Sequence, residues 1–120
     1  MLKRYLLIND LKPECVHEYI QAHQTMHLGE WKEQLEVLKN AGASECIVYV
    51  HENLSILLYE CEDIEESFAM LGKNPQRSAW DSYMAPMFAG QPKFDGSESI
   101  PTIKKVFDMK QQLNGILNDF

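Results

Sequence analysis

The sequence predicts an α+β domain of the ferredoxin-like βαββαβ type, in which a four-stranded antiparallel sheet carries both helices on one face. Two observations lead to this fold class. β-Prone runs alternate with amphipathic stretches in the order strand, helix, strand, strand, helix, strand, and only three residues separate the two middle runs. At 120 residues the chain has room for one such domain and little more.

The amino-terminal half is expected to hold one strand and one long helix. Residues 3–11 are rich in Tyr, Leu and Ile and predict the strand, and Pro13 marks the helix start because proline suits a first helical position. Apolar and aromatic residues then recur every three or four positions up to residue 40, where a stop signal follows. Gly29 costs about 1 kcal/mol relative to Ala inside a helix, so we expect a bend there.

The second half is expected to hold a hairpin, a broken helix, a turn-rich loop and a last strand. These elements are predicted at residues 46–50 and 54–61 (hairpin), 63–72 and 76–88 (helix), 90–99 (loop) and 100–109 (strand). The helix breaks at Lys73-Asn74-Pro75, because proline cannot continue a helix. We therefore expect one domain over residues 1–109, with residues 110–120 as a helical extension of it.

Charge and cysteine content exclude several classes of partner. Eleven basic residues against eighteen acidic ones give a formal charge of −7, and the basic residues form no run, so nucleic acid is not an expected partner. The apolar stretch near the amino terminus is too short for a signal peptide or a membrane span, so no membrane partner is expected. Cys15, Cys46 and Cys61 lack Cys-x-x-Cys spacing and predict free thiols in a cytoplasmic protein.

Four side chains on the expected long helix lie four residues apart, namely Tyr19, His23, His27 and Trp31. Residues at this spacing share a helix face. Each step of four advances about 400°, so three consecutive members can share a pocket but all four cannot. Imidazoles beside aromatic faces suit acid/base work on a small polar ligand, although the same pattern is also typical of a packed core.

The sequence contains no metal-binding motif and no phosphate-binding motif. No group of His, Cys and acidic residues has the spacing of a metal site, and there is no glycine-rich phosphate loop. We therefore expect neither a metal nor a cofactor. His17 and His51, near a helix start and in a turn, are expected at the surface.

Three segments carry a resemblance to a known family. They are Lys12-Pro13-Glu14 followed by Tyr19 and His23, the stretch 31–42 that begins at Trp31, and the stretch from Asn74-Pro75 through Trp80 to Tyr83-Met84-Ala85-Pro86. With these segments the chain resembles the L-rhamnose mutarotase family, to about Met109. The resemblance implies a small dimeric α/β-barrel protein that interconverts the anomers of a deoxy-sugar without a cofactor.

The resemblance also implies roles for individual residues. Aligned from the amino terminus, His23 takes the catalytic place and Tyr19 that of a sugar-binding tyrosine. Four more residues than in the family separate His23 from Trp31, so alignment back from Trp31 puts His27 in the catalytic place and His23 in that of the tyrosine. We favour His23, since Tyr19 is then kept. The substrate-binding residues implied are Tyr19, Cys46, Trp80, Asp81 and Trp31.

Two positions depart from the family pattern. Trp80-Asp81 stands where the family usually has two tryptophans, and Cys46 stands where it has a tyrosine. Trp80 is expected to stack on a pyranose. Asp81 would accept hydrogen bonds and favour a sugar with a hydroxyl where L-rhamnose has its methyl group or a hydroxyl of the opposite configuration. Two alternatives to a mutarotase stay open, a non-catalytic ligand-binding dimer and a monooxygenase-like enzyme of the same superfamily.

The second face of the expected sheet has no helix to cover it. A sheet face rich in Tyr, Leu and Val would form an exposed apolar patch. Pairing of two copies, sheet face to sheet face, covers it with the commonest oligomer symmetry. We therefore expect a homodimer that acts on a small sugar.

Overall fold

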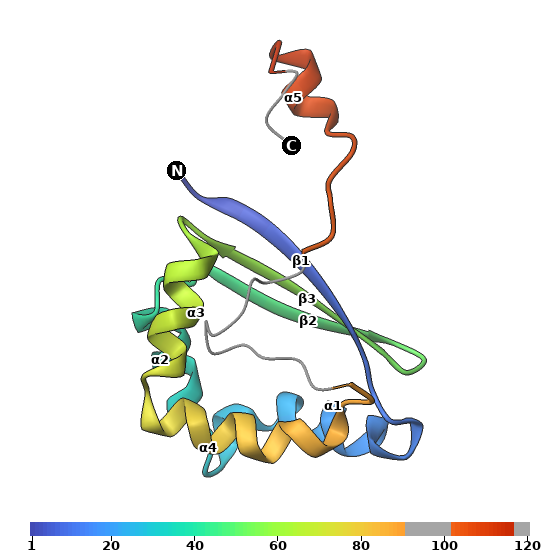
Figure 1. Ribbon diagram of the computed structural model, residues 1–120, viewed down its shortest axis with the longest axis vertical. Helices are drawn as coiled ribbons and strands as arrows, with labels where there is room; N and C mark the ends of the chain where they lie inside the picture. Colours follow the sequence, from blue (N-terminus) through green and yellow to red (C-terminus); the bar gives the residue numbers. More distant parts are fainter. Residues whose placement is uncertain (91–101, 117–120) are drawn as a thin grey trace.

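A three-stranded sheet with helices on one face makes up the computed structural model, which describes residues 1–90 and 102–116. Figure 1 shows α1 and α4 running beneath the sheet and α2 and α3 standing at one side of it. The elements are, in chain order, β1 (Lys3–Asp10), η1 (Pro13–Cys15), α1 (Val16–Gln24), η2 (Met26–Leu28), α2 (Glu33–Asn40), β2 (Glu45–His51), β3 (Leu54–Cys61), α3 (Ile64–Gly72), α4 (Pro75–Met84), η3 (Ala85–Met87) and α5 (Met109–Leu113).

The sheet has the order β1-β3-β2, and both pairs of neighbours are antiparallel. β2 and β3 form the predicted hairpin, whose turn contains Glu52 in the left-handed region at φ 53°. Tyr59 on β3 lies opposite Tyr5 on one side and Cys46 on the other. Because cross-strand partners share a face, these three side chains all point to the side that carries the helices.

The predicted fourth strand is not a strand of this sheet. In the described part of residues 100–109, Ile103 alone bridges β1, where its N–H donates to the Leu6 carbonyl oxygen at 2.7 Å. Further along, the Asp108 side chain accepts a hydrogen bond from the N–H of Gln111 and so caps the start of α5. Asp108 also forms an ion pair with Lys105. This local capping replaces strand pairing, and Figure 1 shows the chain leaving the sheet toward α5. Residues 100 and 101 and the loop predicted at 91–99 lie outside the described residues.

The expected single helix from Pro13 to residue 40 is divided into two. α1 ends at Gln24, and α2 begins at Glu33. Thr25 donates its hydroxyl to the Gln21 carbonyl at 2.8 Å, a bond that competes with helix continuation, and Gly29 is extended at φ −129°. The predicted bend is therefore a full interruption that contains η2.

The second helix is broken as predicted. α3 ends at Gly72 and α4 begins at Pro75, where the Asn74 side chain accepts from the N–H groups of Gln76 and Arg77. An Asn cap followed by proline starts a helix in two ways at once, because it satisfies free N–H groups and fixes φ. This new start sets the direction of α4 beneath the sheet.

Two clusters of buried side chains fill the space between sheet and helices. We call the first the closed core, and it joins β1 and β3 to α2 and α3: Leu7, Val37, Ala41, Tyr59, Cys61, Ile64, Phe68 and Leu71. We call the second the pocket core, and it joins α1 to α4 and η3: Leu11, Tyr19, Ala22, Met26, Trp80, Met84, Met87 and Phe88. The division of the core leaves a hollow between its two parts.

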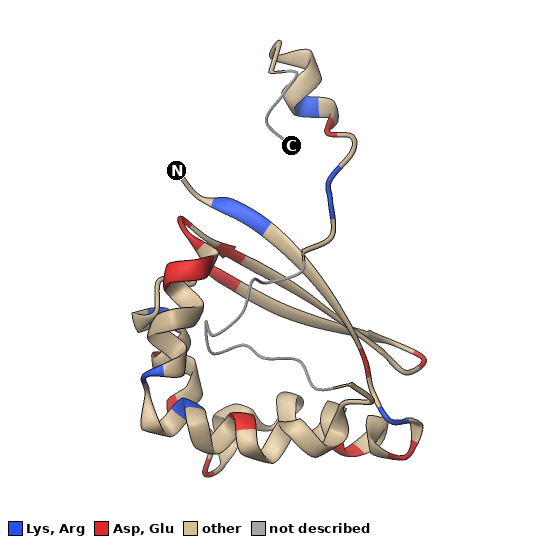
Figure 2. Cartoon of the chain, in the orientation of Figure 1, with Lys and Arg blue, Asp and Glu red and all other residues tan. Residues whose placement is uncertain are grey.

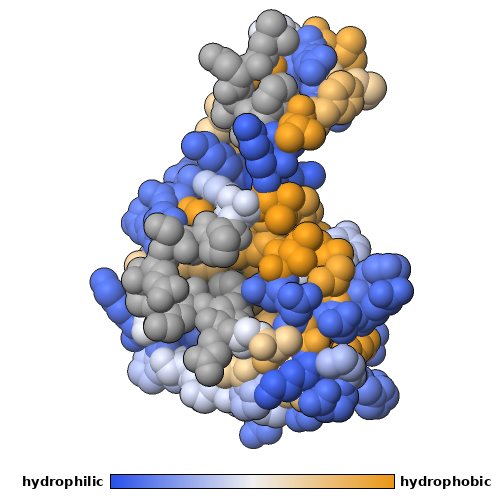
Figure 3. All heavy atoms as spheres, turned by 45° about the vertical axis from the view of Figure 1, so that its right-hand side comes forward, coloured by the Kyte–Doolittle hydropathy of each residue, from blue (hydrophilic) through white to orange (hydrophobic). Residues whose placement is uncertain are grey.

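The outer face of the sheet carries no helix in the described chain. Its exposed apolar side chains come from β1 and β2 and include Leu6, Ile8, Ile47 and Tyr49, which are 38% to 55% exposed. Figure 2 shows that charged residues lie toward the ends of the strands, and Figure 3 shows hydrophobic side chains gathered over the middle of the molecule. None of the described helices is both long and apolar enough to cross a bilayer.

Candidate active site

A cavity of about 660 Å³ lies between the helices and the covered face of the sheet. This size is within the range of small-molecule sites. Leucine, methionine and aromatic side chains make up much of its wall. Its polar lining includes Tyr19, His23, Cys46, Ser55, Arg77 and Asp81.

His23 lies in the last turn of α1, and its ring is half-buried against the cavity. Its Nδ1 lies 2.8 Å from the carbonyl oxygen of Tyr19. A carbonyl can only accept, so Nδ1 carries the proton, and Nε2 of the neutral ring is left with a free lone pair. Burial lowers the pKa of His23, and the nearby Arg77 cation lowers it further, against the effect of the carbonyl bond. The imidazole is therefore neutral at neutral pH and can act as a base.

Tyr19 stands one helical turn before His23, and the two ring centroids are 4.3 Å apart. Its hydroxyl shares a 2.6 Å hydrogen bond with Ser55 on β3, and only 4% of the residue is exposed. Burial raises the pKa of this phenol, which keeps it neutral. The bond to the sheet fixes α1, and with it His23, at a set distance from β3.

Trp80 supports the imidazole from the side of α4. Its ring meets His23 edge to face at 5.2 Å, and it is 3% exposed. Behind it, Trp31 packs edge to face on Trp80 and stacks on Tyr83 at 5.3 Å with a tilt of 10°. Trp80 borders the cavity, whereas Trp31 is not among its lining residues.

The remaining predicted site residues differ in their surroundings. His27 lies in η2, borders the cavity and is exposed. Cys46 lies on β2 and is exposed toward the cavity, and desolvation by the surrounding walls raises the pKa of its thiol. All three cysteines are free, as predicted, and His17 and His51 are exposed, as predicted.

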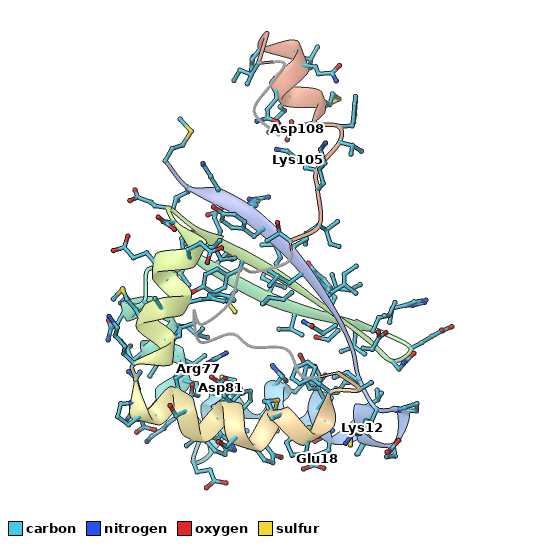
Figure 4. The ribbon with its side chains drawn as sticks, in the orientation of Figure 1. Lys12, Glu18, Arg77, Asp81, Lys105 and Asp108 are labelled. Carbon is cyan, nitrogen blue, oxygen red and sulfur yellow. The ribbon has the colours of Figure 1, made fainter. Side chains whose placement is uncertain are left out.

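Asp81 forms an ion pair that the sequence reasoning missed. Arg77 lies one turn earlier on α4, and its Nε is 3.0 Å from Asp81 Oδ1. Figure 4 shows both side chains rising from α4 into the space below the sheet. Basic and acidic residues four apart on a helix attract each other, so this spacing was a usable signal. Ser55, the partner of Tyr19, was also missed, since a serine inside a strand carries no sequence signal of its own.

Comparison with known proteins identifies the relatives of this arrangement. A crystal structure of the L-rhamnose mutarotase FA22100 from Formosa agariphila shares the fold, with a TM-score of 0.65 and 21% identity, over 89% of this chain and 98% of that one. No curated protein matches significantly. The family model for L-rhamnose mutarotase matches residues 4–109. That match takes in the sheet, α1 to α4 and every lining residue named above, so the chain belongs to the L-rhamnose mutarotase family.

Proposed function

We propose that the protein interconverts the anomers of L-rhamnose or a related aldose, with His23 as the acid/base group. The observation that carries the proposal is the 2.8 Å bond between His23 Nδ1 and the Tyr19 carbonyl, in a ring with a lowered pKa. It leaves Nε2 unprotonated at a cavity of suitable size. Family membership favours this reaction over a monooxygenase-like one.

The reaction needs one proton moved from one sugar oxygen to another. Nε2 of His23 takes the proton of the anomeric hydroxyl, and the bond between the anomeric carbon and the ring oxygen breaks as the carbonyl forms. The imidazolium returns the proton to the ring oxygen, directly or through water. Rotation about the bond next to the aldehyde and closure by the reverse steps then give the other anomer.

The aromatic neighbours of His23 have positioning roles in this proposal. Tyr19 holds the ring through its backbone carbonyl and is itself tied to Ser55. Trp80 blocks rotation of the imidazole from the other side. The lining residues Tyr19, Cys46, Trp80 and Asp81 bound the space for the sugar, and Trp31 backs Trp80.

Anomer exchange measured by NMR tests the proposal. L-Rhamnose should exchange faster with the protein than in buffer, and His23→Gln should slow the catalysed exchange by about 10²-fold or more. His27→Gln is the matched change at the exposed histidine and should leave the rate within about twofold. Loss of exchange in His27→Gln alone would assign the base to His27. No acceleration with L-rhamnose, L-fucose and their stereoisomers, but with a thermal shift on sugar addition, would indicate the non-catalytic binder.

We further propose that the protein is a homodimer joined through the outer sheet face. Leu6, Ile8, Ile47 and Tyr49 form an exposed apolar surface there, and Ile103 extends it beyond β1. Figure 1 shows the segment after Ile103 leaving the body of the molecule. Its side chains Val106, Phe107 and Met109 are also apolar and exposed. An exposed apolar face of this kind is covered when two copies pair about a two-fold axis.

Light scattering at micromolar concentration checks this assembly. The wild-type mass should be that of two chains, and Ile8→Lys should shift it toward one. Leu28→Lys places the same charge on an exposed leucine of η2 and should leave the mass unchanged. A wild-type monomer would refute the proposal.

A further inference from the structure

Residues 104–116, which we call the arm, lie away from the body of the molecule. Ile103 bridges Leu6 in the antiparallel sense, so the residues that follow run past the start of β1 and off the sheet. Figure 1 shows α5 standing apart from the sheet and from the other helices. No residue of α5 is buried. The family model ends at Met109, so most of α5 lies beyond the part of the chain that it matches.

The arm is nevertheless built as a helix with two defined ends. The Asp108 side chain caps its start by accepting from the N–H of Gln111 at 3.0 Å. At its end, Gly115 takes a left-handed conformation at φ 76°, and the N–H of Ile116 donates to the Gln111 carbonyl oxygen at 2.7 Å. A helix of five residues is still far below the length of about 12–15 residues at which an isolated helix becomes even marginally stable in water. α5 therefore requires packing against another surface.

One side of the arm is apolar and is not covered by the described chain. Met109, Leu113 and Ile116 follow each other at the four- and three-residue spacing of one helix face, and all three are exposed. Val106 and Phe107, just before α5, are apolar and exposed as well. Figure 3 shows this hydrophobic surface on the part that projects from the body of the molecule. A continuous apolar surface of this kind marks a place where another protein surface binds.

The charge of the chain indicates a second copy as the partner. The arm carries three basic residues and one acidic residue, whereas residues 1–90 carry seven basic and fourteen acidic ones. A basic arm is attracted to an acidic body, and because the arm departs from its own body, charge favours the body of another copy. Figure 2 shows acidic positions where β2 begins and β3 ends, which is the end of the sheet past which the arm runs. The arm also continues the exposed outer face, since Ile103 lies beside Leu6.

The arm is long enough to cross an interface between two sheets. Residues 104–108 have no regular secondary structure, and five residues of extended chain span about 16 Å. Sheets that pack face to face lie about 10 Å apart. α5 can therefore leave its own sheet and lie on the outer face of the partner's sheet. The exposed apolar side chains of that face include Leu6, Ile8, Ile47 and Tyr49.

We propose that the arm docks on the second copy of the chain in the homodimer, with the side of α5 that carries Met109, Leu113 and Ile116 against the partner's outer sheet face. This inference rests on the proposed homodimer and adds to it an arm exchanged between the two chains. A two-fold axis makes the contact reciprocal, so each arm covers apolar surface of the other chain while its own apolar side is covered. The arm thus obtains the packing that its short helix requires.

Photocrosslinking tests this contact in the intact chain. Phe107→p-benzoylphenylalanine should give a two-chain band on a denaturing gel after irradiation, and peptide mapping should place the attachment on the sheet of the other chain. The same substitution at Leu28, an exposed leucine of η2, should leave a one-chain band. A one-chain band for the variant at Phe107, while light scattering gives the mass of two chains, overturns the inference and leaves the sheet-face homodimer standing.

A second measurement separates the apolar contact from helix formation. Met109→Gln/Leu113→Gln removes apolar side chains but keeps the helix, since Gln, Met and Leu are similarly good helix formers. The dissociation constant of the dimer, measured by sedimentation equilibrium, should rise by about tenfold or more. Asn114→Gln changes a position about 100° around the helix from Leu113 and should leave the constant within about twofold.

The remaining outcomes also decide the question. An unchanged dissociation constant in the double variant overturns the inference. A wild-type monomer overturns it together with the proposed homodimer. Anomer exchange is a separate measurement on the same samples, so a failure of the mutarotase proposal is distinguished from a failure of the arm contact.

Discussion

The closed core and the pocket core each contain a buried tyrosine–serine hydrogen bond, but the two bonds have different roles. In each, a buried tyrosine hydroxyl meets a serine hydroxyl, Tyr59 with Ser67 on α3 and Tyr19 with Ser55 on β3. The Tyr59 ring then packs on Phe68 at 5.1 Å, whereas the Tyr19 ring lies against His23. Both hydrogen bonds join a helix to the sheet. The one at Tyr19 also orients the imidazole of His23, which can titrate.

Truncation of Phe68 should give the largest effect, and that effect is on stability. The residue is 2% exposed at the centre of the closed core, so Phe68→Ala is expected to lower the free energy of unfolding by about 3–5 kcal/mol. Urea denaturation measures it. Met70→Ala on the exposed side of the same helix should cost within about 0.5 kcal/mol. A loss below about 1 kcal/mol in Phe68→Ala would show that the closed core does not depend on this ring.

The pH profile of exchange should reveal the different surroundings of His23. Its pKa is lowered, mainly by burial, so the catalysed rate should persist below the ordinary histidine value of about 6.5 and then fall about tenfold per pH unit. The unfolded chain binds this proton at higher pH than the folded one, so acid should also reduce the stability contributed by this group.

Exchange rates measured from about pH 4 to about pH 8, which covers the range in which histidine titrates, check this expectation. The rate of the buffer reaction is subtracted at each pH. His23→Gln should remove the acid limb from the catalysed rate. A midpoint at or above the ordinary histidine value would contradict the assignment, because burial and the Arg77 cation would then have no measurable effect.

The two tyrosine hydroxyls offer the finest comparison. Tyr59→Phe and Tyr19→Phe each leave a buried serine without its partner and should each cost about 1–2 kcal/mol of stability. Anomer exchange should slow in Tyr19→Phe, because α1 loses its tie to β3, and should be kept in Tyr59→Phe. Chemical denaturation and NMR exchange on the same samples measure both effects. Equal slowing in the two variants would mean that the tie at Ser55 does not position His23.

The order of elements was predictable because it depends on local patterns. The hairpin, the helix break at Pro75 and the Tyr19 and His23 pair all follow from short-range chemistry. The fourth strand was predicted wrongly, since β-prone residues such as Val106 and Phe107 do not reveal that Asp108 caps a helix that begins at Met109. Strand pairing depends on distant partners, which the pattern of one segment does not contain.

The residue types at the site could be predicted from the sequence, but the hydrogen bonds and ion pair between them could not. Periodicity placed His23 near Tyr19, yet the carbonyl bond that fixes its tautomer depends on the rotamer of the ring. Arg77 was missed, although its spacing from Asp81 was visible, because a helix ion pair is usually a surface feature. Burial of that pair is decided by the packing of α4 beneath the sheet, which is a tertiary property.

The interruption between α1 and α2 also bears on how this site tolerates changes in chain length. One residue inserted within a helix turns everything beyond it by about 100°. Because α1 ends at Gln24, a change in length between Thr25 and Lys32 is absorbed in irregular backbone and in η2. The segment acts as a length buffer at the rim of the cavity. Residues can be inserted or deleted there without changing the orientation of the His23 imidazole relative to the sheet.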